Sequence, residues 1–245
     1  MNVFEIFYSK FEGFLSPFIT FYNQMIVLDG YKNVLKGLAN TALIAVFGLF
    51  IGMFLGCILA TCKILPKRRA PLKILSGIVD VYVAIFRGTP MVVQLLLIHF
   101  VIFPAFGVDI PSVAEAILAF GLNSAAYVAE IIRGGILSVD IGQTEAGRAL
   151  GLGYGRTMIK IVLPQAIKNV VPTLGNEFIA LLKETSVVSF IAVVDITKAF
   201  QNIANSTYEF IIPYIVLALV YLVIVLAATG IIKLVERRLR ASDKR

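Results

Sequence analysis

The sequence predicts an all-α integral membrane protein with about five transmembrane helices in one domain. Three observations lead to this fold class: 59% of the 245 residues are hydrophobic, only 15% are charged, and the mean hydropathy is +0.90. A soluble domain of this length carries roughly a quarter of its residues as charged side chains. Much of the surface must therefore face lipid, and we predict neither β-strands nor internal repeats.

Long stretches without a charged residue identify the first spans. A helix needs about 20 mostly apolar residues to cross a bilayer, because the hydrocarbon offers no water to its backbone groups. Residues 38–62, 88–108 and 210–232 contain no charged side chain, and we expect a span in each. Residues 116–129 are apolar but short, and residues 169–200 are interrupted by charges, so hydropathy alone leaves the number of spans open.

The basic residues decide the number of spans and their direction. Residues 63–73 hold five basic side chains and no acidic one, and the stretch from Lys233 to the C-terminus holds six against two. Basic loops remain cytoplasmic, so an even number of crossings separates these stretches, and the basic segment 140–168 between them favours four. We therefore predict spans near residues 35–62, 72–104, 112–136, 165–186 and 209–235, with the N-terminus outside and the C-terminus in the cytoplasm.

The same reasoning divides the chain into three parts. Residues 1–34 are too interrupted by polar side chains to span, so we expect an extracytoplasmic or interfacial segment and no secretory signal peptide. Residues 35–237 are expected to form the transmembrane domain, with 138–165 as its cytoplasmic loop. Residues 238–245 are expected to form a cytoplasmic tail.

Composition also argues against several classes of protein. The net charge of +7 does not indicate nucleic-acid binding, because the basic residues fall in short blocks beside apolar stretches. Cys57 and Cys62 lie five residues apart in the first span and point to different helix faces, which predicts neither a disulfide nor a metal site. His99 is the only histidine, and its sequence neighbours lack partners for a proton relay, so we expect a packed histidine.

The cytoplasmic loop 138–165 contains the most informative pattern. Thr144 is expected to cap a helix that carries Glu145 in its first turn, where a carboxylate complements the positive end of the helix dipole. Gly151 and Gly153 are expected to end this helix after about two turns, because glycine admits the left-handed conformation of a helix end. So short a helix needs a partner to pack on, and it predicts a projection that fits a groove in another protein.

This loop resembles the EAA signature of bacterial ABC importer permeases. It reads Glu145-Ala146-Gly147, then Gly151, then Ile161-Val162-Leu163-Pro164. The family has Glu-Ala-Ala, a glycine four positions after the second alanine, and Ile-x-Leu-Pro after nine more residues. Gly147 is the one departure; it loosens the helix but keeps the small side chain that close contact requires.

Three further segments resemble the permeases for polar amino acids, the group that serves histidine, arginine, glutamine and glutamate. They are Arg87-Gly88-Thr89-Pro90 followed by Gln94, residues 127–135, and residues 177–186. The resemblance extends over residues 35–235. The sequence does not say which amino acid would be carried.

The resemblance implies a type I importer permease core in the bacterial inner membrane. Such a permease pairs with an identical or paralogous permease, two cytoplasmic ABC ATPase subunits and an extracytoplasmic solute-binding protein. ATP and Mg²⁺ would bind the ATPase chain, because this chain has no GxxxxGK[ST] loop; we expect it to bind no cofactor and to catalyse no reaction. The residues expected to contact the ATPase are Thr144, Glu145, Ala146, Gly147, Ala149, Leu150 and Gly151.

Charged and polar residues at membrane depth are candidates for the substrate pathway, since burying them is costly. Arg87 precedes Pro90, which must kink or break a helix, and its guanidinium could bind a substrate carboxylate or pair structurally with Asp80. Thr89 and Gln94 could add hydrogen bonds, although polar contacts between helices are also common.

A second interrupted helix is expected in the fourth span, where Asn176 and Glu177 follow Pro172 and Gly175. Broken helices that line a cavity are where transporters place their sites. Glu177 could face a substrate ammonium or guanidinium, or Arg87.

For other residues of the third span the sequence predicts less specific roles. Glu130 and Arg133 are three residues apart on one helix face and are expected to pair as a structural brace or an ATPase contact. Asn123 and Tyr127 could line the pathway or simply pack.

Two other functions were weighed against an ATP-driven importer. An ion-gradient-driven secondary amino acid transporter would also use broken helices and buried charges, but it predicts an inverted repeat or a carboxylate–histidine chain, and neither is evident. A membrane-embedded enzyme would need a metal-ligand cluster or a nucleophile–base pair, which these motifs lack.

Overall fold

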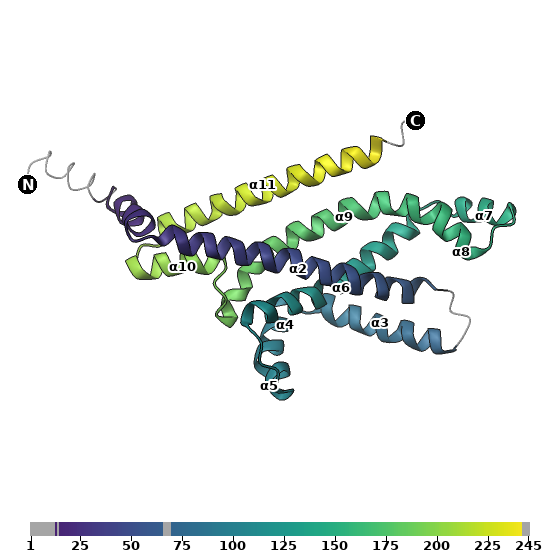
Figure 1. Cartoon of the computed structure of the whole chain (residues 1–245), viewed down its shortest axis with the longest axis horizontal. Helices are drawn as coiled ribbons and strands as arrows, with labels where there is room; N and C mark the ends of the chain where they lie inside the picture. Colours follow the sequence, from purple (N-terminus) through teal and green to yellow (C-terminus); the bar gives the residue numbers. More distant parts are fainter. Residues whose placement is uncertain (1–12, 14, 66–69, 242–245) are drawn as a thin grey trace, which may run out of the picture.

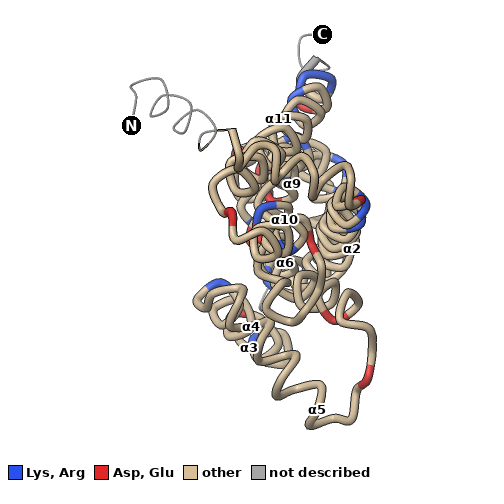
Figure 2. The backbone as a smooth tube through the Cα atoms, turned by 90° about the vertical axis from the view of Figure 1, so that its left-hand side faces the viewer, with Lys and Arg blue, Asp and Glu red and all other residues tan. Residues whose placement is uncertain are grey.

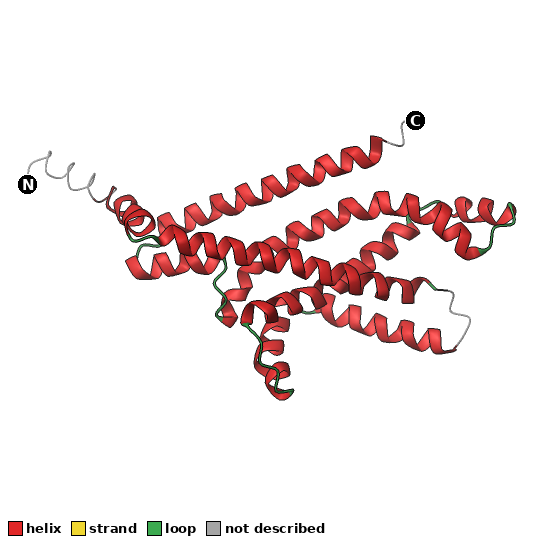
Figure 3. Cartoon of the chain, in the orientation of Figure 1, coloured by secondary structure: helices red, strands yellow, loops and turns green. Residues whose placement is uncertain are grey.

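The computed structural model describes residues 13, 15–65 and 70–241. Within these ranges the chain is an elongated bundle of helices and contains no strand, as predicted (Figures 1 and 3). The helices are η1 (Asn23–Val27), α2 (Gly30–Ile64), α3 (Ala70–Gly88), α4 (Met91–Leu97), η2 (Ile98–Ile102), α5 (Phe103–Ala105), α6 (Ser112–Leu137), α7 (Ile141–Ala149), α8 (Tyr154–Thr157), η3 (Met158–Val162), α9 (Leu163–Glu184), η4 (Thr185–Ile191), α10 (Ile196–Thr207) and α11 (Ile211–Ala241).

The centre of the bundle is the contact between α2 and α6, which pack along most of their length. Three glycines of α2, spaced four residues apart, allow this approach: Gly48, Gly52 and Gly56. A Cβ atom on Gly52 would lie 2.6 Å from the Cβ of Ser124, and one on Gly56 would lie 2.7 Å from the Cβ of Val128. Small residues at this spacing let two helix backbones approach closely where lipid surrounds them.

Three helices are each long and apolar enough to cross a membrane by length and composition: α2, α6 and α11. They confirm helices at the predicted spans 35–62, 112–136 and 209–235. Figure 2 shows that Lys, Arg, Asp and Glu occupy few places along the tube of the backbone. α9 covers the predicted span 165–186 and packs against α6 and α11, but its charged residues lower its hydropathy, so a span there stays a prediction.

The predicted span 72–104 is broken at Pro90, which confirms the expectation that this proline kinks or breaks the helix. α3 ends at Gly88, α4 begins at Met91, and the two segments are bent by 109°, so together they form at most one broken span. The charge-free stretch 88–108 is correspondingly not a span by itself; it contains α4, the π-helical turn η2 and α5. Pro90 causes the break, because it lacks a backbone N–H and disfavours helical geometry in Thr89 before it.

The second expected interruption, in the fourth span, is wrong. α9 runs from Leu163 to Glu184 without a break, with Pro172 inside it. Gly175 is a packing residue there, since a Cβ atom on it would lie 2.6 Å from Cγ2 of Ile232 on α11. Close contact with α11 therefore explains this glycine better than backbone flexibility.

The connection from α9 to α11 is anchored on the first turns of α2. Asp195 is fully buried and caps α10, accepting hydrogen bonds from the backbone N–H groups of Thr197 (3.0 Å) and Lys198 (2.8 Å). Asn40 of α2 donates to the carbonyl of Val194 at 2.8 Å. The charges of Asp195 and Lys198 thus belong to a connecting segment and not to a span.

The two ends of the bundle carry different elements. α7, α8 and the C-terminal ends of α2 and α11 lie at one end, while η1 and α10 lie at the other (Figure 1). The described parts of the three predicted cytoplasmic segments are therefore at the same end, and that this end faces the cytoplasm stays a prediction. Some of the predicted residues lie outside the described ones: residues 1–12 and 14 of the segment 1–34, the basic residues Lys67, Arg68 and Arg69, and residues 242–245 of the predicted tail.

Candidate functional site

The projection at one end of the bundle is built around α7. Its N-cap is Asp140, whose Oδ1 accepts a hydrogen bond from the backbone N–H of Gly142 at 2.6 Å. The predicted cap, Thr144, is wrong, because the helix begins three residues earlier at Ile141. A carboxylate directly before the first turn is the stronger cap of the two.

The end of α7 confirms one of the two predicted glycines. Gly151 has a φ angle of +80°, the left-handed conformation, and its backbone N–H donates to the carbonyl of Arg148 at 3.0 Å. Gly153 does not stop α7; its φ angle is −65° and it precedes α8. The helix is nine residues long, close to the predicted length.

Gly147 explains the departure from the Glu-Ala-Ala pattern. It is the buried residue of α7, and a Cβ atom on it would lie 2.7 Å from Cγ2 of Thr157 and 3.0 Å from Cδ1 of Ile161. An alanine would require these neighbours to shift. The predicted need for a very small side chain is therefore met by contact inside this chain, between α7 and the helix that leads into α9.

The predicted coupling residues divide between two faces of the projection. Glu145, Ala146, Ala149 and Leu150 are exposed, and Leu150 is 81% exposed. Thr144 instead lines a cavity of about 450 Å³ between α7 and the ends of α2 and α6. The outer face is free for a partner, whereas Thr144 and Gly147 face the chain itself.

The break between α3 and α4 brings three of the predicted pathway residues together. Nε2 of Gln94 donates to the carbonyl of Phe86 at 2.8 Å and to Oγ1 of Thr89 at 2.9 Å. Nδ2 of Asn123 on α6 donates to Oε1 of Gln94 at 2.8 Å. Side chains thus supply hydrogen bonds where the backbone of the helix is interrupted.

Arg87 lies at the same break and faces α6. Its guanidinium lies 3.9 Å from Oε2 of Glu130 and 5.3 Å from the centre of the Tyr127 ring. Its side chain is 44% exposed. The suggested structural partner Asp80 instead pairs with Lys63 at 2.9 Å.

Glu130 is the centre of a charged cluster that we call the Glu130 cluster: Lys63, Asp80, Arg87, Glu130 and Arg133. Its carboxylate pairs with Lys63 at 2.5 Å and with Arg133 at 2.8 Å. The predicted pair within α6 is confirmed, and the structure adds partners from α2 and α3. Lys63 and Arg133 also line the cavity beneath α7, so this cluster lies between that cavity and the break at Pro90.

The remaining predicted pathway residues lie on α9, and one of them, Glu177, interacts with Arg87 electrostatically but without direct contact. Glu177 of α9 accepts a hydrogen bond from Oγ of Ser124 at 3.2 Å, and no ion pair joins it to Arg87 in the described part of the chain. Asn176 is exposed. The structure therefore connects Arg87, Thr89 and Gln94, but it does not bring Asn176 or Glu177 into contact with them.

His99 has a partner that the sequence did not reveal. Its Nδ1 contacts the carboxylate of Glu115, a buried residue near the start of α6. The expected packing of His99 agrees with its half-buried position and its edge contact with the Phe100 ring, while its polar partner comes from another helix and not from its sequence neighbours. No group of three or more His, Cys, Asp or Glu among residues 15–65 and 70–241 could hold a metal ion.

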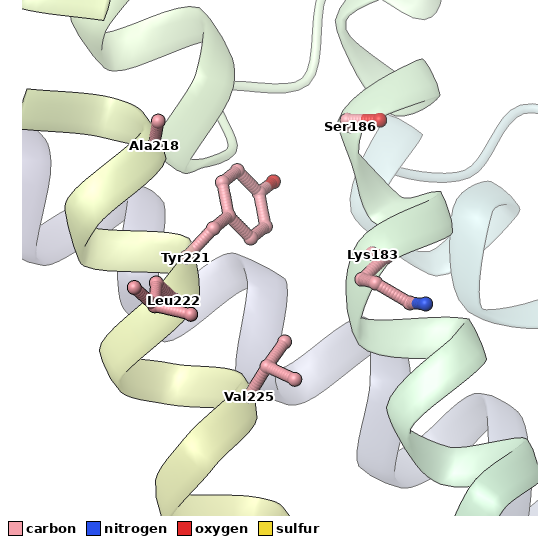
Figure 4. A pocket seen from close by; sticks show the side chains of 6 residues that line it. All are labelled: Lys183, Ser186, Ala218, Tyr221, Leu222 and Val225. Atoms are coloured by element: carbon pink, nitrogen blue, oxygen red, sulfur yellow. The ribbon is translucent and has the colours of Figure 1, made fainter. Parts of the chain in front are cut away.

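A second open space lies between α9 and α11. It measures about 480 Å³, with Lys183 and Ser186 on the side of α9 and Ala218, Tyr221, Leu222 and Val225 on α11 (Figure 4). The ring of Tyr221 extends toward α9, and its hydroxyl lies 2.9 Å from Oγ1 of Thr197. None of the predicted pathway residues lines this groove.

These features together define a class: a helical membrane transport subunit with a short capped projection at one end. The family described as "Binding-protein-dependent transport system inner membrane component" matches residues 48–241. The chain belongs to this family, and it is a multi-pass membrane protein and the permease subunit of an ABC importer.

Relatives with assigned transport systems agree with this membership. The chain is 42% identical to the arginine transport system permease protein ArtQ of Bacillus subtilis (strain 168), over 86% of this chain and 94% of that protein. It is 38% identical to the putative glutamine transport system permease protein GlnP of Rickettsia bellii (strain RML369-C), over 85% of this chain and 94% of that one.

Solved structures show the same fold. A chain of a structure described as "Crystal structure of an amino acid ABC transporter with histidines" is 38% identical, with a TM-score of 0.80 and coverage of 87% of this chain and 97% of that one. The inward-facing methionine ABC transporter MetNI shares the fold at 21% identity, with a TM-score of 0.59 and coverage of 84% and 95%. The predicted permease fold and the resemblance to amino acid permeases are confirmed.

Proposed function

We propose that this permease forms the substrate pathway of an ATP-driven importer for polar amino acids and couples it to a separate ATPase through α7. The exposed face of α7 would fit a groove of the ATPase, which would hold ATP and Mg²⁺. An extracytoplasmic solute-binding protein would deliver the amino acid, and a second permease, identical or paralogous, would complete the pathway. The end that carries α7 and the C-terminus would face the cytoplasm.

The observation that supports this proposal most strongly is the close packing of α7 against the helix that continues into α9. Gly147 packs directly against Thr157 and Ile161, so a displacement of α7 must also displace that helix. On the outer face of α7, Glu145 and Leu150 are exposed, and no described residue of this chain covers them. A helix held firmly on one side and exposed on the other is suited to transmit movement from a partner.

Replacement of Glu145 tests the coupling role. Glu145→Ala removes an exposed carboxylate that would make charge-assisted hydrogen bonds to the ATPase. We expect ATP-driven uptake to fall by at least about tenfold, and less ATPase to co-purify with the permease in detergent. Gly151→Ala should act in the same direction, because it strains the left-handed turn that ends α7.

The matched control is Asp109→Ala, which removes an exposed acid from the connection between α5 and α6. Both proteins should insert into the membrane in normal amounts. Normal uptake by Glu145→Ala and Gly151→Ala, or equal losses in the control, would contradict the coupling role of α7.

The proposed pathway site is the break at Pro90, with Arg87 as the ligand of the substrate carboxylate. Arg87 borders this break in the chain and its side chain is partly exposed, and an arginine can bind a carboxylate through two parallel hydrogen bonds. Asn176 and Glu177 are proposed to face the pathway at a second position along α9, where Glu177 could meet a substrate ammonium or guanidinium.

Replacement of Arg87 tests this site. Arg87→Ala should lower uptake of labelled L-arginine, L-glutamine and L-histidine by more than about tenfold, since a charge-assisted pair is lost. Basal ATP hydrolysis by the assembled complex should persist. Normal uptake in this variant would show that the site is misplaced, while leaving the coupling role of α7 intact.

The alternative, a transporter driven by an ion gradient, receives one point of support from the contact of His99 with Glu115. Within the described residues, however, neither side chain makes a further side-chain hydrogen bond or ion pair, so the two do not form a chain of proton carriers. Uptake into proteoliposomes distinguishes the two functions: it should require ATP on the side of α7 and continue after the ion gradients are dissipated.

A further inference from the structure

The three cations that surround Glu130 are held with different strength. Lys63 and Arg133 lie at 2.5 Å and 2.8 Å from its carboxylate, at the lengths of charge-assisted hydrogen bonds. Arg87 lies at 3.9 Å, beyond hydrogen-bonding distance. Glu130 is 16% exposed and Arg87 is 44% exposed. Arg87 is therefore the cation that can leave most easily.

Departure of Arg87 would not leave a charge without a partner. Removing the last partner of a buried carboxylate is strongly destabilising, but Glu130 would still have Lys63 and Arg133. Arg87 in turn would keep the face of the Tyr127 ring, which attracts a cation. An exchange of partners by Arg87 therefore costs little free energy for either Glu130 or Arg87.

The charges of the Glu130 cluster leave room for one further anion. Within ion-pair distance, three cations (Lys63, Arg87 and Arg133) stand against two acids (Asp80 and Glu130), which gives an excess of one positive charge. Glu177 of α9 also attracts Arg87, from beyond ion-pair distance. A single carboxylate would neutralise the excess of the cluster. Arg87 is the most exposed of the three cations and borders the break at Pro90 in the chain, so it is the one that such a carboxylate would reach.

We propose that Glu130 is a positioning residue that holds Arg87 in the substrate-free permease and exchanges it for the α-carboxylate of the transported amino acid. This inference rests on the proposed pathway site, in which Arg87 binds the substrate. It adds that the permease carries an internal competitor for its own carboxylate ligand. Such a competitor weakens substrate binding and speeds release, which suits a pathway that must not retain its substrate.

The test compares Glu130→Gln with Asp80→Asn. Each variant removes one negative charge from the same cluster, but only Glu130 contacts Arg87, since Asp80 pairs with Lys63. Binding of L-arginine, L-glutamine and L-histidine, and of their carboxamides, is measured on the purified permease–ATPase complex. Uptake kinetics are measured in proteoliposomes with the binding protein present.

Glu130→Gln should bind at least one of the amino acids about three- to fivefold more tightly, as expected for loss of a partly exposed competing ion pair. Its maximal uptake rate should fall, because release becomes slower. Binding of the carboxamides should stay unchanged, and Asp80→Asn should remain within about twofold of the parent. A purely structural role for Glu130 would not distinguish carboxylate from carboxamide.

A second variant, Glu130→Asp, tests the proposal if Glu130→Gln fails to give an assembled complex. Glu130→Asp keeps the charge but withdraws the carboxylate by one methylene, and it should shift binding in the same direction by a smaller factor. In an Arg87→Ala background, Glu130→Gln should have no effect on binding.

Equal shifts in Glu130→Gln and Asp80→Asn, or weaker binding in Glu130→Gln, would overturn the exchange while leaving the pathway site intact. By contrast, a normal affinity in Arg87→Ala, or no binding of any of the three amino acids by the parent complex, would overturn the pathway site itself, and the exchange with it.

Discussion

Two prolines in segments expected to span, Pro90 and Pro172, have different effects on their helices. At Pro90 the helix stops and the chain turns by 109°, whereas α9 passes through Pro172 without a break. At the first site the hydroxyl of Thr89 donates to the carbonyl of Ile85 at 2.8 Å, and Gln94 donates to the carbonyl of Phe86 at 2.8 Å. Side chains there replace the backbone donors of the lost turn.

α9 is held by packing instead. Gly175 allows close contact with Ile232 of α11, and the hydroxyl of Thr173 donates to the carbonyl of Asn169 at 3.0 Å within the helix. A proline removes one helical hydrogen bond in either case. A proline alone therefore does not determine whether a helix breaks. The break forms where neighbouring side chains can donate hydrogen bonds to the released carbonyl groups.

The largest expected effect comes from removing the side chain that supports the break. Gln94→Ala leaves the carbonyl of Phe86 and the amide of Asn123 without this partner in a buried site, which costs about 3 kcal/mol of stability. The unfolding midpoint of the purified complex should fall by several degrees, and uptake should fall with it. Gln165→Ala in α9 is the control for stability: its exposed amide loses hydrogen bonds to Ile161 and Gln143 that water can replace, so the unfolding midpoint should change little. Equal losses in both variants would remove the distinction between the two helices.

A smaller effect is expected from filling the contact between α9 and α11. Gly175→Ala places a methyl group 2.6 Å from Cγ2 of Ile232, and overpacking of this kind costs about 2 kcal/mol. The same thermal measurement should show a loss of stability. Gly134→Ala on α6 is the matched control: a Cβ atom there meets nothing within 4 Å, so the variant should be neutral or slightly more stable. A stable Gly175→Ala would show that α11 is not held tightly against α9.

The smallest effect is expected at the proline of the continuous helix. Pro172→Ala should change stability by less than about 1 kcal/mol and leave uptake within about twofold, because α9 is already helical at this position. Pro90→Ala should reduce uptake more, since it permits the helix to re-form across Thr89. If Pro172→Ala instead reduced uptake more than Pro90→Ala, the proline of α9 would be the more important one for transport.

The sequence predicts the helices that depend on local composition. Charge-free stretches locate α2 and α11 because lipid exposure acts on each segment separately, and the pair of Glu130 with Arg133 follows from helical spacing. The capping residue of α7 was misplaced because several residues near Asp140 can cap, and the choice depends on where the helix begins.

Features that depend on contact between distant segments could not be predicted in this way. His99 meets Glu115 from another helix, and Glu130 meets Lys63 from α2, at separations that no local pattern records. The continuity of α9 through Pro172 likewise depends on its packing partners. Arg87, Thr89 and Gln94 were found because they are neighbours in sequence, whereas Asn123 completes their hydrogen bonds from α6.

The contact of Gly147 with Thr157 has a mechanical consequence. α8, η3 and α9 follow one another without a gap from Tyr154 to Glu184, about 46 Å of helical path at the ordinary helical rise. No space remains between Gly147 and Thr157 for a larger side chain. A movement of α7 would therefore pass to this helical segment with little loss.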